Sequence, residues 1–187
     1  MKVAIGISTA GLVKSQTVFS LLNMLKGVTC EIFIKEGPII PLNREIIAEL
    51  AIQAGCSHLL FVDSDMSFGK EALLTLLSRK KDIIGVNYHL RQLPLVTTVK
   101  MDSEKKKTVA EDYPDGVFPC SAVATGFMLI SIDVFQKLKK PWFYVGIDEK
   151  GELEGHDYRF CRLAREAGFE IWCDMTVEVK HIGDFAY

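Results

Sequence analysis

Residues 58–65 of this chain, with the sequence HLLFVDSD, constrain its fold more than any other stretch. An apolar run bounded by polar residues is typical of a strand buried on both faces of a sheet. Because side chains alternate along a strand, we expect Asp63 and Asp65 on one side and Ser64 on the other. Open α/β sheets bind ligands at the carboxyl ends of such strands. The two carboxylates repel each other, and a divalent cation shared with an anionic ligand would relieve that repulsion.

A structural role for the same acids stays open at this point. An Asp that follows a strand often caps the next helix, and Asp65 could do so for a helix near Gly69. The pattern Asp-x-Asp is also common by chance. The stretch therefore predicts a buried strand, and it leaves a metal site and a helix cap as alternatives.

Apolar spacing on both sides of this stretch predicts alternating strands and helices. The expected strands cover 2–8, 31–35, 58–65 and 82–88, and the expected helices cover 15–26, 43–54 and 69–79. Such alternation implies right-handed crossovers and a mostly parallel sheet. At 187 residues the chain is expected to form a single domain.

The second half of the sequence is less regular. Further strands are expected at 95–100, 123–132, 170–173 and 179–183, and helices at 133–138 and 153–167. The charged segment 101–115 is expected to be a flexible hairpin or a lid.

Composition excludes several classes of protein. With a net charge of −2 and no basic stripe, nucleic-acid binding is not expected. No apolar run approaches the roughly 20 residues that span a bilayer, and the N-terminus runs directly into a strand rather than a signal peptide. The five scattered cysteines form no Cys-x-x-Cys pair and are expected to be small buried groups. We therefore expect a soluble, cytoplasmic protein.

Three motifs follow one another along the chain: Asp63-Ser64-Asp65, Gly155-His156-Asp157 and, near the C-terminus, His181. Their order and spacing resemble the GT-A glycosyltransferases, particularly the family 2-like enzymes and their small phage and bacterial relatives. The resemblance covers nearly the whole chain and also includes Asn43-Arg44 and the segments 125–130, 167–171 and 180–183.

The resemblance implies a GT-A, Rossmann-like α/β fold, in which a mostly parallel central sheet is flanked by helices and the C-terminal half is less regular. Residues 1–100 would form the nucleotide-binding half and residues 101–187 the acceptor-side half, which also closes the metal site. The implied activity is metal-dependent transfer of one sugar from a nucleotide sugar, a UDP-sugar, to a hydroxyl of a glycan or another acceptor. A non-processive enzyme is implied, because the Gln-x-x-Arg-Trp motif and membrane helices of processive synthases are missing. The resemblance also implies an inverting enzyme.

The resemblance also assigns a metal site to Asp63, Asp65 and His181. Asp65 would coordinate Mn²⁺ or Mg²⁺ directly, and Asp63 would reach the ribose or, through water, the metal. The ion would neutralise the departing diphosphate. The alternative for His181 is a half-exposed histidine near the end of the chain.

Asp157 matches the family's catalytic base, which removes a proton from the acceptor hydroxyl. Its place in the first turn of a helix favours the ionised form, and stabilising that helix is the alternative role. The family usually has Glu-Asp at this point, whereas this chain has His156 before Asp157. Glu154 is therefore a second candidate for the base.

The resemblance also suggests nucleotide-binding residues, from the places that they occupy in the family's fold. For each of them, a structural role in a loop or turn remains the alternative. The candidates are Ser8, Thr9, Glu36, Arg44, Asp63 and, beneath the sugar, Gly126. The aromatic residues 142–144 would either stack on an acceptor sugar or pack in the core.

Two other functions remain open from the sequence. One is a catalytically silent module that binds a nucleotide or a glycan on the same fold. The other is a nucleotidyltransferase, although the loop at residues 8–11 lacks the glycine-rich, basic character of a triphosphate-binding loop. The sequence leaves open the oligomeric state, the sugar, the acceptor and whether transfer inverts or retains the anomeric configuration.

Overall fold

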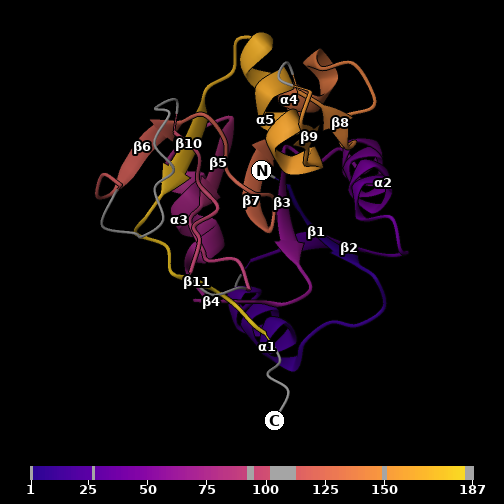
Figure 1. Ribbon diagram of the computed structural model, residues 1–187. Coiled ribbons are helices and arrows are strands. Elements are labelled where there is room, and N and C mark those ends of the chain that lie inside the picture. Colours follow the sequence, from indigo (N-terminus) through magenta and orange to yellow (C-terminus); the bar gives the residue numbers. More distant parts are fainter. Residues whose placement is uncertain (1, 27, 92–94, 102–112, 149–150, 184–187) are drawn as a thin grey trace.

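A seven-stranded sheet with the order β2-β1-β3-β7-β5-β10-β6 forms the centre of the molecule (Figure 1). The computed structural model describes residues 2–26, 28–91, 95–101, 113–148 and 151–183. The strands of this sheet are β1 (Val3–Thr9), β2 (Cys30–Glu36), β3 (His58–Asp63), β5 (Ile83–Val86), β6 (Val117–Cys120), β7 (Phe127–Ser131) and β10 (Ile171–Asp174).

The strand directions confirm a mostly parallel sheet. Strands β2, β1 and β3 pair in parallel, and so do β5 and β10. Strand β7 is antiparallel to both β3 and β5, and β6 is antiparallel to β10. Five of these seven strands therefore point the same way, and their carboxyl ends meet at one edge of the sheet.

Helices cover both faces of the sheet. On one face, α2 (Ile40–Gln53), α4 (Ile132–Lys137) and α5 (His156–Glu166) share one hydrophobic core with the strands. On the other face, α1 (Ser15–Met24) and α3 (Ala72–Ser78) share a second core. This two-sided cover explains why the central strands are buried along most of their length and consist mainly of apolar residues.

Strand β3 is buried on both faces, as its sequence predicts. Leu59 and Phe61 lie in the core beneath α2, whereas Leu60 and Val62 lie in the core on the α1 side. None of the four is more than 1% exposed. Burial of each such side chain contributes about 1.5–3 kcal/mol, so β3 holds the two layers together.

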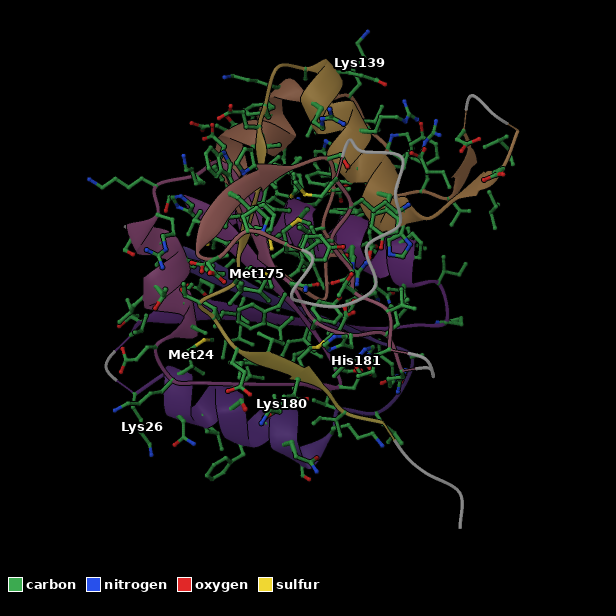
Figure 2. The ribbon with its side chains drawn as sticks, turned by 60° about the vertical axis from the view of Figure 1, so that its left-hand side comes forward. Met24, Lys26, Lys139, Met175, Lys180 and His181 are labelled. Carbon is green, nitrogen blue, oxygen red and sulfur yellow. The ribbon has the colours of Figure 1, made fainter. Side chains whose placement is uncertain are left out.

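Two small sheets lie outside the central one. Strand β4 (Met66–Phe68) pairs with β11 (Val179–His181), and this ribbon packs against α1 through a hydrogen bond from the Phe68 N–H to Ser20 Oγ. Lys180 and His181 are the last two residues of β11 (Figure 2). None of the helices in the described ranges is long and apolar enough to cross a bilayer.

The last long helix begins later than its apolar spacing predicts. Strand β9 (Leu153–Glu154) pairs with β8 (Gly146–Ile147), so α5 starts at His156 and not at residue 153. This start places His156 and Asp157 in the first turn of the helix.

The expected strand at 95–100 is reduced to two isolated bridges, His89–Thr97 and Lys100–Ala122. Strands β4 and β6 were not expected at all. Of the segment 101–115, residues 102–112 lie outside the described residues, so the hairpin or lid stays a prediction.

We predict that Phe61→Ala lowers the free energy of unfolding by about 3–5 kcal/mol, because it opens a cavity under the edge-to-face ring of Phe143. Chemical denaturation followed by circular dichroism measures this change. Phe19→Ala is the matched control, since Phe19 is 69% exposed on α1 and should change stability by no more than about 0.5 kcal/mol. Equal effects of the two substitutions would contradict the proposed core.

Candidate functional site

The site lies where β3 ends. Asp63 is the last residue of the strand, and its N–H donates to the carbonyl of Gly126, just before β7, at 2.9 Å. The chain then turns through Ser64 and Asp65 into β4. The expectation that Asp63 and Asp65 share one face of a strand is therefore wrong, because Asp65 lies in a turn. The helix-cap alternative for Asp65 is also wrong, since α3 begins at Ala72.

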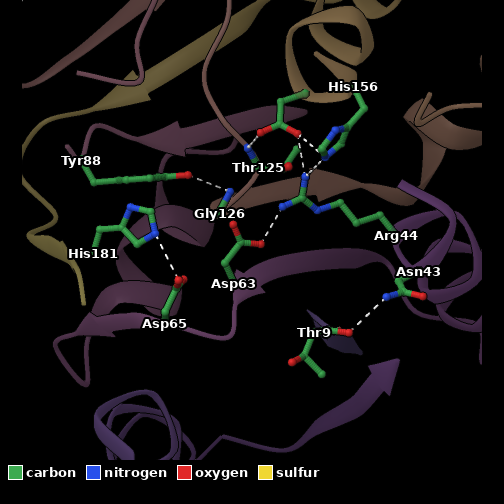
Figure 3. A network of polar contacts seen from close by, with 11 residues as sticks. Thr9, Asn43, Arg44, Asp63, Asp65, Tyr88, Thr125, Gly126, His156 and His181 are labelled. Atoms are coloured by element: carbon green, nitrogen blue, oxygen red, sulfur yellow. Dashed lines mark hydrogen bonds and ion pairs between the residues drawn. The ribbon is translucent and has the colours of Figure 1, made fainter. Parts of the chain in front are cut away.

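Arg44 joins two carboxylates that are far apart in sequence. From α2 its Nη2 donates to Asp63 Oδ1 and its Nη1 donates to Asp157 Oδ1, each at 2.6 Å (Figure 3). The side chain is only 3% exposed. Burial acts to lower the pKa of Arg44, but Asp63 and Asp157 together raise it above its ordinary value. The guanidinium is thus a fixed buried cation between the two acids.

Asp157 is held from both sides in the first turn of α5. Its Oδ2 accepts a hydrogen bond from the backbone N–H of Thr125 at 3.2 Å, and its Oδ1 lies 2.6 Å from His156 Nε2. Burial acts to raise the pKa of Asp157, but Arg44 and His156 hold it well below the usual range of an aspartate. Asp157 is therefore ionised across the physiological pH range.

His156 shares its ring nitrogen between the two charged partners. Nε2 touches both Arg44 Nη1 and Asp157 Oδ1. An unprotonated Nε2 accepts a hydrogen bond from Arg44, whereas a protonated Nε2 donates a hydrogen bond to Asp157. The sequence identified His156 only as a departure from the Glu-Asp pattern and did not predict this contact.

A second polar group contains Asp65 and His181. His181 Nε2 lies 3.3 Å from Asp65 Oδ2, and Arg91 Nη1 lies 3.1 Å from the same oxygen. Burial acts to raise the pKa of Asp65, but His181 and Arg91 lower it below the ordinary value. The structure thus brings together two of the three predicted metal ligands.

The third predicted ligand, Asp63, points to Arg44 instead. Within the described residues, no group of three or more His, Cys, Asp and Glu side chains is arranged to hold a metal ion. A cation here would have only Asp65 and His181 as protein ligands. Mg²⁺ sites in phosphate-handling proteins often use one or two carboxylates and complete the shell with phosphate oxygens and water.

The ring orientation of His181 fits such a cation. Its Nδ1 lies 3.1 Å from the carbonyl oxygen of His89, which can only accept a hydrogen bond, so Nδ1 carries the proton. Nε2 faces the Asp65 carboxylate, so it donates a hydrogen bond to that carboxylate when the ring is doubly protonated, and a cation that replaced this proton would have a ligand on each side. A metal-binding histidine typically donates its other N–H to a carbonyl in this way.

Tyr88 lies between the two polar groups. Its hydroxyl accepts a hydrogen bond from the N–H of Gly126 at 3.1 Å, and its ring meets the His181 ring edge-on (Figure 3). Burial, with Asp63 and Asp157 adding to it, raises the pKa of Tyr88 well above its ordinary value. A Cβ at position 126 would collide with Tyr88 and Met66, so these side chains cover the glycine that was expected to face a sugar.

The predicted nucleotide-binding residues lie at the ends of β1 and β2. Ser8 and Thr9 are buried, and Ser8 is paired with Asp63 in the sheet register. Asn43 Nδ2 donates to the carbonyl of Thr9 at 3.3 Å (Figure 3). The same nitrogen donates to the carbonyl of Gly37 at 2.9 Å, so Asn43 ties the two strand ends together. Glu36 is exposed at the end of β2.

Glu154 lies outside the Arg44 network. Its carboxylate accepts hydrogen bonds from Arg159 at 3.2 Å and from Arg162 at 3.1 Å. Both arginines belong to α5, so the contacts of Glu154 tie β9 to that helix. Asp157, and not Glu154, is the acid beside Asp63.

The aromatic segment packs mainly in the core. Trp142 and Phe143 are 4% and 3% exposed, and Phe143 stacks on Phe160 with ring centroids 4.8 Å apart. The core-packing alternative is therefore confirmed for these two residues.

Four of the five cysteines are buried, as the sequence predicts, and Cys30 is partly buried.

Sequence reasoning missed Tyr88, Arg91 and Thr125. Tyr88 and Arg91 follow the strand β5, and Thr125 precedes Gly126 and β7. Their positions next to strand ends were visible in the sequence. Their convergence depends on β7 entering between β3 and β5, which the sequence did not indicate.

Comparison with known proteins gives a likeness of fold. No family model matches the sequence, and no curated protein matches it. The structure of A197 from STIV is similar with a TM-score of 0.71 and 18% identity, over 98% of this chain and 87% of that chain. The inositol-1-phosphate CTP transferase from T. maritima has a TM-score of 0.51 and 11% identity, over 95% and 88% of the two chains.

S. aureus TarS is also similar, with a TM-score of 0.51 and 12% identity, over 98% of this chain but only 37% of that one. At these identities the likenesses concern the fold alone. The chain has a Rossmann-like α/β fold with a mostly parallel central sheet flanked by helices, as the resemblance implied.

We predict that Arg44→Met destabilises the protein by about 3–5 kcal/mol at neutral pH, because it removes a buried cation and leaves two half-buried carboxylates unpaired. In the wild type, the lowered pKa of Asp157 contributes stability that is present above about pH 4 and is lost on further acidification. The difference between the two proteins should therefore shrink below about pH 4. Urea denaturation across a pH series measures it.

Arg91→Met is the control for this experiment. Its guanidinium also contacts an aspartate, but its side chain is 49% exposed, so the loss should not exceed about 1 kcal/mol. A pH-independent difference, or equal losses for the two variants, would contradict the role of Arg44.

Proposed function

We propose that this chain is a metal-dependent glycosyltransferase that transfers one sugar from a nucleotide sugar, a UDP-sugar, to a hydroxyl acceptor. The observation that carries the proposal is the Asp65–His181 pair beside the end of β3, where His181 Nδ1 donates to a backbone carbonyl and Nε2 faces a carboxylate. That arrangement supports binding of a divalent cation at the sheet edge where α/β proteins bind nucleotides.

Under this proposal Asp65 and His181 bind Mn²⁺ or Mg²⁺, and the diphosphate of the donor completes the shell. When bound, the ion supplies positive charge that stabilises the departing diphosphate. Arg91, which contacts Asp65, adds a second positive charge at the same place. Asp63, held by Arg44, is assigned to the ribose or to a water-mediated contact.

The donor is assigned to residues 1–100 and the acceptor to residues 101–187. The ends of β1 and β2, with Ser8, Thr9 and Glu36, would take the uridine, and Asn43 keeps those ends together. Gly126 would contribute backbone and not an open floor, because Tyr88 and Met66 cover it.

Asp157 is assigned as the base that accepts the acceptor's proton. Its carboxylate is ionised, but a pKa held far down by Arg44 makes it a weak base. Arg44 therefore sets the strength of the base as well as its position. The contact between Arg44 and Asp157, which weakens this base, also supports the alternative that the chain binds nucleotide sugars without catalysing transfer.

We expect Asp65→Ala and His181→Ala each to weaken Mn²⁺-dependent UDP binding by about 10–100-fold, because each removes one of two protein ligands. Isothermal titration calorimetry with and without Mn²⁺ measures this change. Glu178→Ala is the control, since Glu178 lies beside β11 and is 79% exposed. Unchanged affinity in both site variants would rule out this metal site.

Asp157→Asn separates a transferase from a silent binding module. As a transferase, the wild-type protein should slowly hydrolyse a UDP-sugar in the absence of acceptor, and the variant should lose at least about 100-fold of that rate. UDP affinity should stay nearly unchanged. Detectable binding without any hydrolysis by the wild type, across a panel of UDP-sugars, would favour the silent module.

A nucleotidyltransferase is the second candidate, supported by the likeness to the inositol-1-phosphate CTP transferase over most of both chains. The same acids and cation would then act on a nucleoside triphosphate and a sugar phosphate. Release of pyrophosphate from that pair of substrates, with no UDP release from UDP-sugars, would select this function over glycosyl transfer.

A further inference from the structure

The edge strand β2 carries an unusual exposed surface. It is the first strand of the seven-stranded sheet, and in the described part of the chain no strand pairs with its outer side. Ile32 and Ile34 on one face of this strand are 45% and 60% exposed. A long edge strand with exposed apolar side chains is a template for pairing with another strand.

The neighbouring helix α2 adds a second apolar surface at the same edge. Leu42 and Leu50 are 51% and 37% exposed, and Ile46 between them is partly buried. These three residues are spaced four apart, so they form one stripe along the helix.

The contacts of α2 show which way this stripe points. Glu45 accepts hydrogen bonds from the backbone N–H groups of Trp142 and Phe143, and Glu49 pairs with Lys140. The side of α2 that carries Glu45 and Glu49 therefore faces residues 140–143, the segment that follows α4. The apolar stripe lies on the side of α2 away from that segment, towards the β2 edge. Figure 1 shows α2 on the outside of the molecule at this edge.

We propose that this edge binds a second copy of the same chain, and that the two β2 strands pair antiparallel about a two-fold axis at Phe33. The strand sequence CEIFIKE is complementary to itself in this register. Glu31 lies opposite the partner's Lys35, and Ile32 lies opposite the partner's Ile34. Opposite charges and apolar side chains in directly opposed positions each stabilise a strand pair.

The same axis also brings the helices together. Strand β2 has seven residues and α2 has fourteen, so they are about 23 and 21 Å long and run along each other. With Phe33 at the axis, Ile46 lies near its own copy and Leu42 near the partner's Leu50. A two-fold contact of this kind is closed, so it yields a dimer and not a fibre.

Charge reversal tests the register directly. Glu31→Lys places Lys opposite Lys at two symmetric positions, and Lys35→Glu places Glu opposite Glu. Each variant should raise the dimer dissociation constant by about tenfold or more in analytical ultracentrifugation. An equimolar mixture of the two variants should restore dimers, because every charged pair across the mixed interface is again opposite in sign.

Two further variants keep the test decisive. Lys70→Glu reverses an exposed charge just before α3, a helix on the face of the sheet opposite α2. This variant should dimerise with the dissociation constant of the wild type. Leu42→Glu should weaken the dimer without touching the strand charges. Circular dichroism confirms that each variant is folded.

A wild-type protein that stays monomeric at the highest attainable concentration would overturn the proposal. So would single charge reversals that dimerise as well as Lys70→Glu, or a mixture of them that stays monomeric while the wild type dimerises. None of these results would bear on the metal-binding and hydrolysis tests of the proposed activity.

Discussion

The contact on which the rest of the site depends is the buried guanidinium of Arg44. It bridges the end of β3 to the start of α5 through Asp63 and Asp157, across 19 and 113 positions of sequence. Removal of its charge would leave two half-buried carboxylates close together without a cation, at a cost of several kcal/mol. Arg44 thereby fixes where α5 begins relative to the sheet and keeps Asp157 ionised beside Thr125.

The polar residues of the site fall into two groups, which differ in whether they could bind a further cation. Asp63 and Asp157 each direct an oxygen at the buried Arg44, so a cation fixed by burial already occupies the space between them. Asp65 and His181 form a different pair, because Nε2 of His181 faces the Asp65 carboxylate and the cation beside that carboxylate, Arg91, is 49% exposed and is not fixed by burial. Tyr88 separates the groups and contacts both through Gly126 and the His181 ring. A cation is therefore expected at the second group and not at the first.

The sequence predicted those parts of the fold that depend on local patterns. The apolar run before Asp63 and the spacing in α1 and α2 identified elements within a few residues of their observed bounds. The antiparallel entry of β7 between β3 and β5 was not predictable, because strand pairing is a non-local property that periodicity does not encode. The separation of Asp63 from Asp65 was missed for a related reason. Strand alternation applies only while the strand continues, and β3 ends at Asp63.

The most direct test of the account is anomalous diffraction from crystals grown with Mn²⁺ and UDP. We predict one strong manganese peak that contacts Asp65 and the Nε2 atom of His181, with the diphosphate beside it, while Arg44 still bridges Asp63 and Asp157. Bound UDP with no manganese at that pair, or with manganese held elsewhere, would contradict the assignment of the site.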